Sequence, residues 1–142
     1  MVLPAVPVDL VSWSSWDGKQ PIDLWKGIEI LRHAAKPLPG VAQTPVYIGE
    51  IGLAENTGLS RADIINWWDE RMAVLLALKV PYILYWELYC NEPKDHNKSN
   101  RVVRPASELT GKWLIRPDGS HSNSLDYFEA LLAKSKGEQQ AK

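Results

Sequence analysis

The sequence has 142 residues, of which 45% are hydrophobic and 23% charged, and this composition is typical of one soluble globular domain. The formal net charge is −1, so no basic field exists to attract nucleic acid. The single cysteine, Cys90, excludes an intrachain disulfide and a multi-cysteine metal site. The N-terminus has no basic region and is interrupted by Pro4 and Pro7. It therefore predicts neither a signal peptide nor a membrane span, which leaves the cytoplasm as the default location.

The first half of the chain predicts two strands separated by a helix. Residues 8–14 (VDLVSWS) are rich in β-branched and aromatic residues and precede the turn-like pair Asp17-Gly18. A helix is expected to begin at Pro21 and to end before Pro37. Its predicted core positions recur at helical spacing, namely Ile22, Trp25, Ile28, Leu31 and Ala35. Residues 45–52 (PVYIGEIG) predict the second strand.

The second half repeats the alternation. Ser60 and Asp63 resemble a capping box before a helix over residues 61–78, whose predicted core positions are Ile64, Trp67, Trp68, Arg71, Leu75 and Leu78. Residues 82–89 (YILYWELY) predict a third strand, followed by a polar stretch over 90–111 that is long for an ordinary connection. Residues 112–115 predict a small edge strand or hairpin closed by a turn at 117–119. A last helix begins at Ser124, and residues 133–142 are expected to form a disordered tail.

Alternating β and α segments with nearly continuous apolar strands predict an α/β fold with a parallel sheet and right-handed crossovers. Ligands of such sheets bind at the carboxyl ends of the strands. Trp13, Glu50 and Glu87 occur at equal intervals late in the three apolar runs. We therefore expect any site to lie on the rim that these strand ends form.

The three strand ends VDLVSWSSWD, YIGEIG and YILYWELYCNE resemble the last three β/α units of the TIM-barrel glycoside hydrolases of the cellulase-like, retaining superfamily called clan A. The resemblance implies a single partial (β/α)8 barrel over residues 1–142. It implies Glu50 as the catalytic nucleophile and Trp86 as the platform for a sugar ring. The further substrate-binding residues that it suggests are Ser14, Trp16, Glu87 and Asn91. The family often has a His near the end of the sixth strand, where this chain has Trp13 to Trp16.

A complete barrel needs roughly 250 residues, and the family carries its acid/base Glu on the fourth strand. We therefore expect a C-terminal part of such an enzyme, which is inactive alone. Its expected ligand is an oligo- or polysaccharide, and its expected partner is a second copy or a complementing N-terminal barrel chain, because open strand edges and an apolar inner face favour association. No cofactor is expected, since no strand precedes a glycine-rich phosphate loop.

Two other hypotheses stay open: a non-catalytic carbohydrate-binding remnant that uses Trp16 and Trp86, and an unrelated doubly wound α/β domain in which Glu50 is structural. Glu87 is a site residue only if it, rather than Trp86, points toward the site, and Glu92 in the long loop is either solvated or a substrate contact. No metal site is expected, because His33 is predicted on a helix surface, and His96 and His121 lie in polar loops with no ligand partners at metal spacing. Cys90 is expected to be a small buried hydrophobe.

Overall fold

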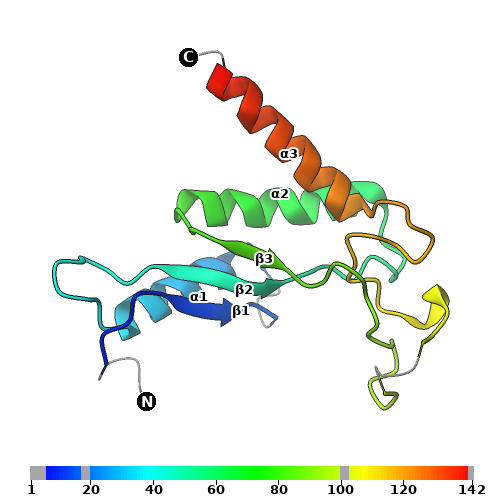
Figure 1. Cartoon of the computed structure of the whole chain (residues 1–142), viewed down its shortest axis with the longest axis horizontal. Coiled ribbons are helices and arrows are strands. Elements are labelled where there is room, and N and C mark those ends of the chain that lie inside the picture. Colours follow the sequence, from blue (N-terminus) through cyan, green and yellow to red (C-terminus); the bar gives the residue numbers. More distant parts are fainter. Residues whose placement is uncertain (1–5, 17–19, 100–102, 141–142) are drawn as a thin grey trace. The chain divides into compact units, whose positions relative to one another are not determined.

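The computed structural model describes residues 6–16, 20–99 and 103–140 (Figure 1). Its elements are β1 (Val11–Ser14), α1 (Pro21–Ala34), β2 (Val46–Ile51), α2 (Arg61–Ala77), β3 (Ile83–Tyr85), the 3-10 helix η1 (Ala106–Glu108) and α3 (Asn123–Gln140). The predicted turn at residues 17–18 and the N-terminal residues 1–5 lie outside the described residues. The described chain divides into two compact units. The first contains the residues up to 51 and 69–85, and the second contains 52–68 and the residues from 86 onward.

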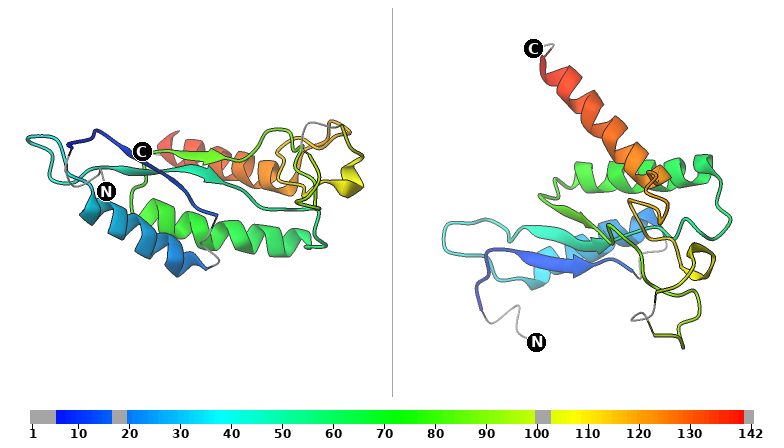
Figure 2. Two further views of the ribbon diagram at one scale, coloured as in Figure 1. Left: turned by 90° about the horizontal axis from the view of Figure 1, so that it is seen from below. Right: turned by 45° about the vertical axis from the view of Figure 1, so that its right-hand side comes forward.

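The first unit contains a three-stranded parallel sheet in the order β1-β2-β3. This arrangement confirms the predicted α/β class and the parallel pairing. Helix α1 and the second half of α2 lie on one face of the sheet (Figure 2, left). The fully buried side chains of this layer are Leu24, Ile28, Val46, Ile48 and Leu75. Arg32 donates a hydrogen bond of 2.6 Å to the carbonyl of Leu78, which joins α1 to the end of α2.

The buried face of α1 differs from the predicted one. Ile22 and Trp25 were expected in the core but are exposed. Ile28 and Ala35 are buried as predicted, and Leu24, which was not predicted, is buried as well. The reason lies on the sheet, where the Trp13 ring packs directly against Gly27. A Cβ atom on Gly27 would lie only 2.3 Å from the tip of that ring. The helix therefore turns its glycine toward Trp13, and the neighbouring positions on that side become the core face.

Strand β3 is much shorter than the predicted strand over residues 82–89. It ends at Tyr85, and Trp86 and Glu87 follow it, joined by a cis peptide bond. The predicted edge strand over 112–115 is not a regular strand, although its backbone pairs with residues 87–88. Glu87 N donates to the carbonyl of Lys112 at 2.8 Å, and Leu114 N donates to the carbonyl of Glu87 at 3.1 Å. An antiparallel bridge between residues 115 and 121 closes the predicted turn at 117–119.

The second unit is held together by the start of α2 and by α3. The predicted capping box is confirmed, because Asp63 N donates to Ser60 Oγ at 3.1 Å and Ser60 N donates to Asp63 Oδ2 at 3.0 Å. Trp68 is fully buried and donates to Ser124 Oγ at 2.8 Å. Its ring also packs on Phe128 of α3, with centroids 4.7 Å apart.

The start of α3 is capped by a buried carboxylate from the loop that follows β2. Glu55 accepts backbone hydrogen bonds from Asn123 at 3.1 Å and Ser124 at 2.8 Å, and Arg116 lies 3.6 Å from it. A carboxylate at this position complements the helix dipole. The helix then continues to Gln140, so residues 133–140 are helical where a disordered tail was predicted. In the part of the chain that the structure describes, no helix is both long and apolar enough to span a membrane.

Candidate functional site

The Glu50 end of β2 is shaped by an extra residue in that strand. Trp13 pairs with Ile48, but the next residue of β1, Ser14, pairs with Glu50, so Gly49 is the additional residue. The pairing with β3 shifts over the same stretch. Strict alternation from Val46 and Ile48 would turn Glu50 toward the helix-covered core. Because of the bulge, Ile51 and not Glu50 occupies the next buried position, and Glu50 is half-buried.

Gly49 has a local packing role at this bulge. A Cβ atom on Gly49 would lie 2.2 Å from the hydroxyl oxygen of Ser12 on the neighbouring strand. Any larger residue would therefore displace the side chain of Ser12 or push β1 away from β2. The glycine of the GEIG sequence thus allows the two strands to approach closely just before the carboxylate.

Three of the predicted site residues meet at this strand end. The indole Nε1 of Trp16 donates a hydrogen bond of 2.7 Å to Glu50 Oε2. The backbone carbonyl of Glu50 accepts hydrogen bonds from Ser15 N at 2.9 Å and from Ser15 Oγ at 3.2 Å. Ser14 is exposed and is the strand partner of Glu50. The structure therefore brings Ser14, Trp16 and Glu50 together, and it supplies Ser15 as an anchor that the sequence analysis had not singled out.

The other predicted residues form a second group, which belongs to the second unit. Trp86 Nε1 donates to Glu92 Oε1 at 3.2 Å. Lys112 Nζ lies 2.9 Å from the other oxygen of the Glu92 carboxylate. Asn91 N donates to Glu87 Oε1 at 3.4 Å. Neither Trp86 nor Glu87 lies within a strand, so the alternation rule used to choose between their orientations does not apply.

The environments of the two carboxylates in this second group shift their pKa values in opposite directions. Burial raises the pKa of Glu87 above its usual value, and the nearby charge of Glu92 adds to the effect, against the hydrogen bond from Asn91. Burial also acts to raise the pKa of Glu92, but the hydrogen bond and charge of Lys112 outweigh it and the net shift is downward. Lys112 therefore favours the charged form of Glu92, whereas burial disfavours the charged form of Glu87.

A pocket of about 290 Å³ adjoins Glu92. Its other lining residues come from the long loop and from the segment that pairs with residues 87–88, namely Pro93, His96, Lys98, Ser99 and Lys112. No local pattern pointed to Lys112, because its partner Glu92 is 20 residues away along the chain. Cys90 is buried, as predicted, in a small apolar cluster with Leu109 and Trp113.

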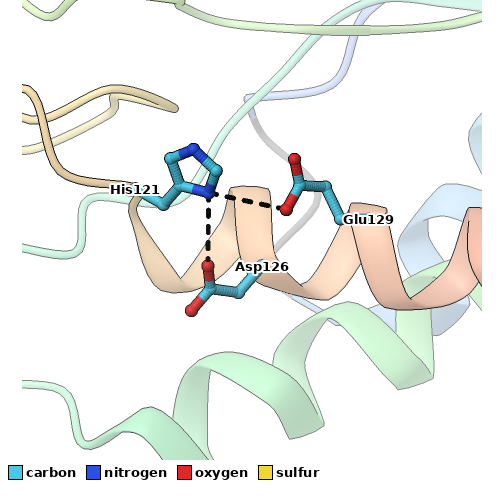
Figure 3. A group of neighbouring side chains, drawn as sticks. All are labelled: His121, Asp126 and Glu129. Atoms are coloured by element: carbon cyan, nitrogen blue, oxygen red, sulfur yellow. Dashed lines mark ion pairs between the residues drawn. The ribbon is translucent and has the colours of Figure 1, made fainter.

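A third group places two carboxylates close to His121, for which the sequence predicted no ligand partners at metal spacing. Its Nδ1 atom lies 3.6 Å from Asp126 Oδ1 and 3.5 Å from Glu129 Oε2 (Figure 3). The spacing rules used on the sequence cover His and Cys motifs within one helix or loop. They missed this group because a turn brings His121 to the side of α3.

No protein-family model, curated protein or solved structure matches the chain. The geometry of these groups is therefore the basis for assigning a function.

Proposed function

We propose that the chain is the nucleophile-bearing part of a retaining glycoside hydrolase of the clan A type, with Glu50 as the nucleophile. The observation that supports this most directly is the hydrogen bond of 2.7 Å from Trp16 to Glu50, at the carboxyl end of a parallel strand. A bulge turns that carboxylate away from the core, and bulges of this kind often re-aim side chains beside active sites. The resemblance of the GEIG sequence to the family's nucleophile motif points to the same residue.

The contacts of Glu50 suit a nucleophilic role. The Trp16 indole donates its N–H to Oε2, which fixes the plane of the carboxylate. Oε1 can then attack the anomeric carbon of the sugar. The new bond joins Oε1 to that carbon, and the glycosidic C–O bond breaks with its electron pair going to the leaving oxygen. In the second step water hydrolyses the glycosyl ester and restores the carboxylate.

The protonation of the leaving oxygen needs a second carboxyl group about 5 Å from the nucleophile in a retaining mechanism. The proposal assigns no residue of the chain to this step. Its direct test must therefore use a substrate whose leaving group departs without a proton.

A glycoside that carries a 2,4-dinitrophenolate leaving group and fluorine at C2 meets this requirement. The phenolate leaves unprotonated, and the fluorine slows hydrolysis of the ester, so the sugar accumulates on the nucleophile. We expect intact-mass spectrometry to show one added sugar per chain for at least one member of a gluco, xylo, manno and galacto panel. Peptide mapping should place the sugar on Glu50, and Glu50→Gln should abolish the addition. Glu70→Gln, which alters an exposed carboxylate on α2 outside both groups, is the control and should label like the parent chain.

The second candidate is carbohydrate binding without catalysis. Trp16 and Trp86 are 39% and 36% exposed. Each donates its indole N–H to a carboxylate, and this hydrogen bond fixes the ring while part of the ring surface stays open to solvent. The C–H edges of a sugar can pack on such rings. Calorimetry with an oligosaccharide panel should then show binding at one of these rings, and the alanine variant of that ring should remove it. Trp25→Ala is the matched control, because Trp25 on α1 is exposed to a similar extent.

Binding without labelling would favour this second candidate over catalysis. Labelling at any residue other than Glu50 would refute the assignment of the nucleophile. Neither labelling nor binding across both panels would contradict both proposals and leave a structural role for Glu50.

A further inference from the structure

We propose that His121, Asp126 and Glu129 form a binding site for one divalent transition-metal ion of the Zn²⁺ type (Figure 3). The three side chains all belong to the second unit. The proposal is independent of the glycosidase assignment, because it uses none of the residues placed in that site.

The spacing of the three ligand atoms matches what a tetrahedral ion requires. Zn²⁺ binds nitrogen and oxygen at about 2.0–2.2 Å, which separates two ligand atoms of a tetrahedron by roughly 3.4 Å. The Nδ1 atom of His121 lies 3.6 Å from Asp126 Oδ1 and 3.5 Å from Glu129 Oε2, and all three atoms lie within 4.8 Å of one another. An ion can therefore be accommodated by small side-chain movements, with water in the remaining position.

The backbone under the three ligands is fixed by contacts on both sides. Asp126 and Glu129 are three residues apart on α3, so they project from the same face of the helix. His121 is held by the turn before α3, where Arg116 donates to its carbonyl oxygen and Ser122 N donates to the carbonyl of Leu114 at 2.8 Å. Because the turn and the helix start are already ordered, binding would cost little conformational entropy.

The charges also favour a cation at this position. Asp126 and Glu129 repel each other in the absence of a cation, since like charges three residues apart destabilise a helix. Arg61 lies 3.6 Å from Asp126 Oδ2, the oxygen that does not face His121, and therefore leaves Oδ1 available to an ion. The presence of an imidazole selects against Ca²⁺ and Mg²⁺, which prefer oxygen ligands alone, and favours Zn²⁺, Ni²⁺ or Cu²⁺.

The side chains of His121 and Glu129 are 49% and 58% exposed. The site is thus open to solvent, and an ion can enter without any rearrangement of the fold. The same openness leaves the carboxylates well hydrated before binding, so we expect a micromolar rather than a nanomolar dissociation constant.

The test is isothermal titration of the untagged, chelator-stripped chain with ZnCl₂. We expect one ion per chain, with affinity reduced by roughly tenfold or more in His121→Ala and in Glu129→Gln. His96→Ala is the matched control, since His96 is an exposed loop histidine outside the group, and it should bind like the parent chain. Circular dichroism should show the same helix content in all variants. Co²⁺ should give visible absorption bands that His121→Ala removes.

Two results would overturn the proposal. One is the absence of binding up to millimolar Zn²⁺. The other is binding that survives His121→Ala within twofold, or that is lost in Cys90→Ser instead, which would place the ion at the thiol.

Discussion

The contact between Trp13 and Gly27 predicts that Gly27→Ala destabilises the first unit, although alanine is the better helix former. Gly27 lies within α1. In an exposed helix the same substitution would stabilise by about 0.8–1.0 kcal/mol, because glycine loses more backbone entropy on folding. Here the new methyl group would lie 2.3, 2.6 and 2.8 Å from three carbons of the Trp13 ring.

The clash outweighs the gain in helix propensity. Separations below 3.0 Å require the indole ring or the helix to move, and the bicyclic ring is rigid and packed between β1 and α1. Overpacking of this kind typically costs about 1–3 kcal/mol. Subtracting the propensity gain of about 1 kcal/mol leaves a net loss of up to about 2 kcal/mol in the free energy of unfolding.

Urea unfolding followed by far-UV circular dichroism measures this difference. The matched control is Gly137→Ala on α3, where nothing lies within 4 Å of the added methyl group, so its effect should be neutral or stabilising. In a Trp13→Leu background Gly27→Ala should become neutral or stabilising as well. If Gly27→Ala stabilises the parent chain as much as Gly137→Ala does, the packing of Trp13 on α1 is wrong.

Three further predictions concern the second unit. Ser124→Ala removes the buried acceptor of the Trp68 N–H and should lower the free energy of unfolding by about 1–3 kcal/mol in urea titrations. Ser60→Ala removes the cap of α2 and should cost about 1 kcal/mol, with Ser60→Asn close to the parent chain. The pKa of Glu92 is lowered in the folded state, so its charge stabilises above its unfolded pKa and that stabilisation is lost as the pH falls through the folded pKa. The pKa of Glu87 is raised, so its ionisation opposes folding at neutral pH. At pH 7 Glu92→Gln should lower the melting temperature and Glu87→Gln should raise it, and both differences should shrink toward about pH 3.

The sequence pattern predicted the elements whose signals are local. The capping box at Ser60 and the core positions Ile64, Trp68 and Leu75 of α2 are confirmed, because a cap and a helical period are both read within a few residues. The order and parallel pairing of the strands also followed from the alternation of segments. These features require no knowledge of distant contacts.

The errors occurred where a distant partner decides the structure. The buried face of α1 follows from Trp13, and no periodicity in the helix itself reveals that partner. Residues 86–89 continue the apolar run of β3, yet residues 87–88 pair with 112–115 instead of extending the sheet. His121, Asp126 and Glu129 come together only because a turn precedes α3. In each case a tertiary contact overrides a local pattern.

Sequential parallel strands with helices on one face occur both in barrel segments and in doubly wound sheets. The GEIG sequence is only partly informative, because Gly49 is already explained by its contact with Ser12. What packing alone does not explain is Glu50. A strand without the extra residue would place an apolar side chain there and continue the buried alternation of Val46 and Ile48. The chain instead interrupts its central strand and pairs the displaced carboxylate with an indole N–H. Replacing Glu50 by Gln keeps the shape and an acceptor for Trp16. If Glu50 is kept for chemistry, the free energy of unfolding should therefore change little in Glu50→Gln. If the charge of Glu50 were needed for folding, its loss would lower the free energy of unfolding.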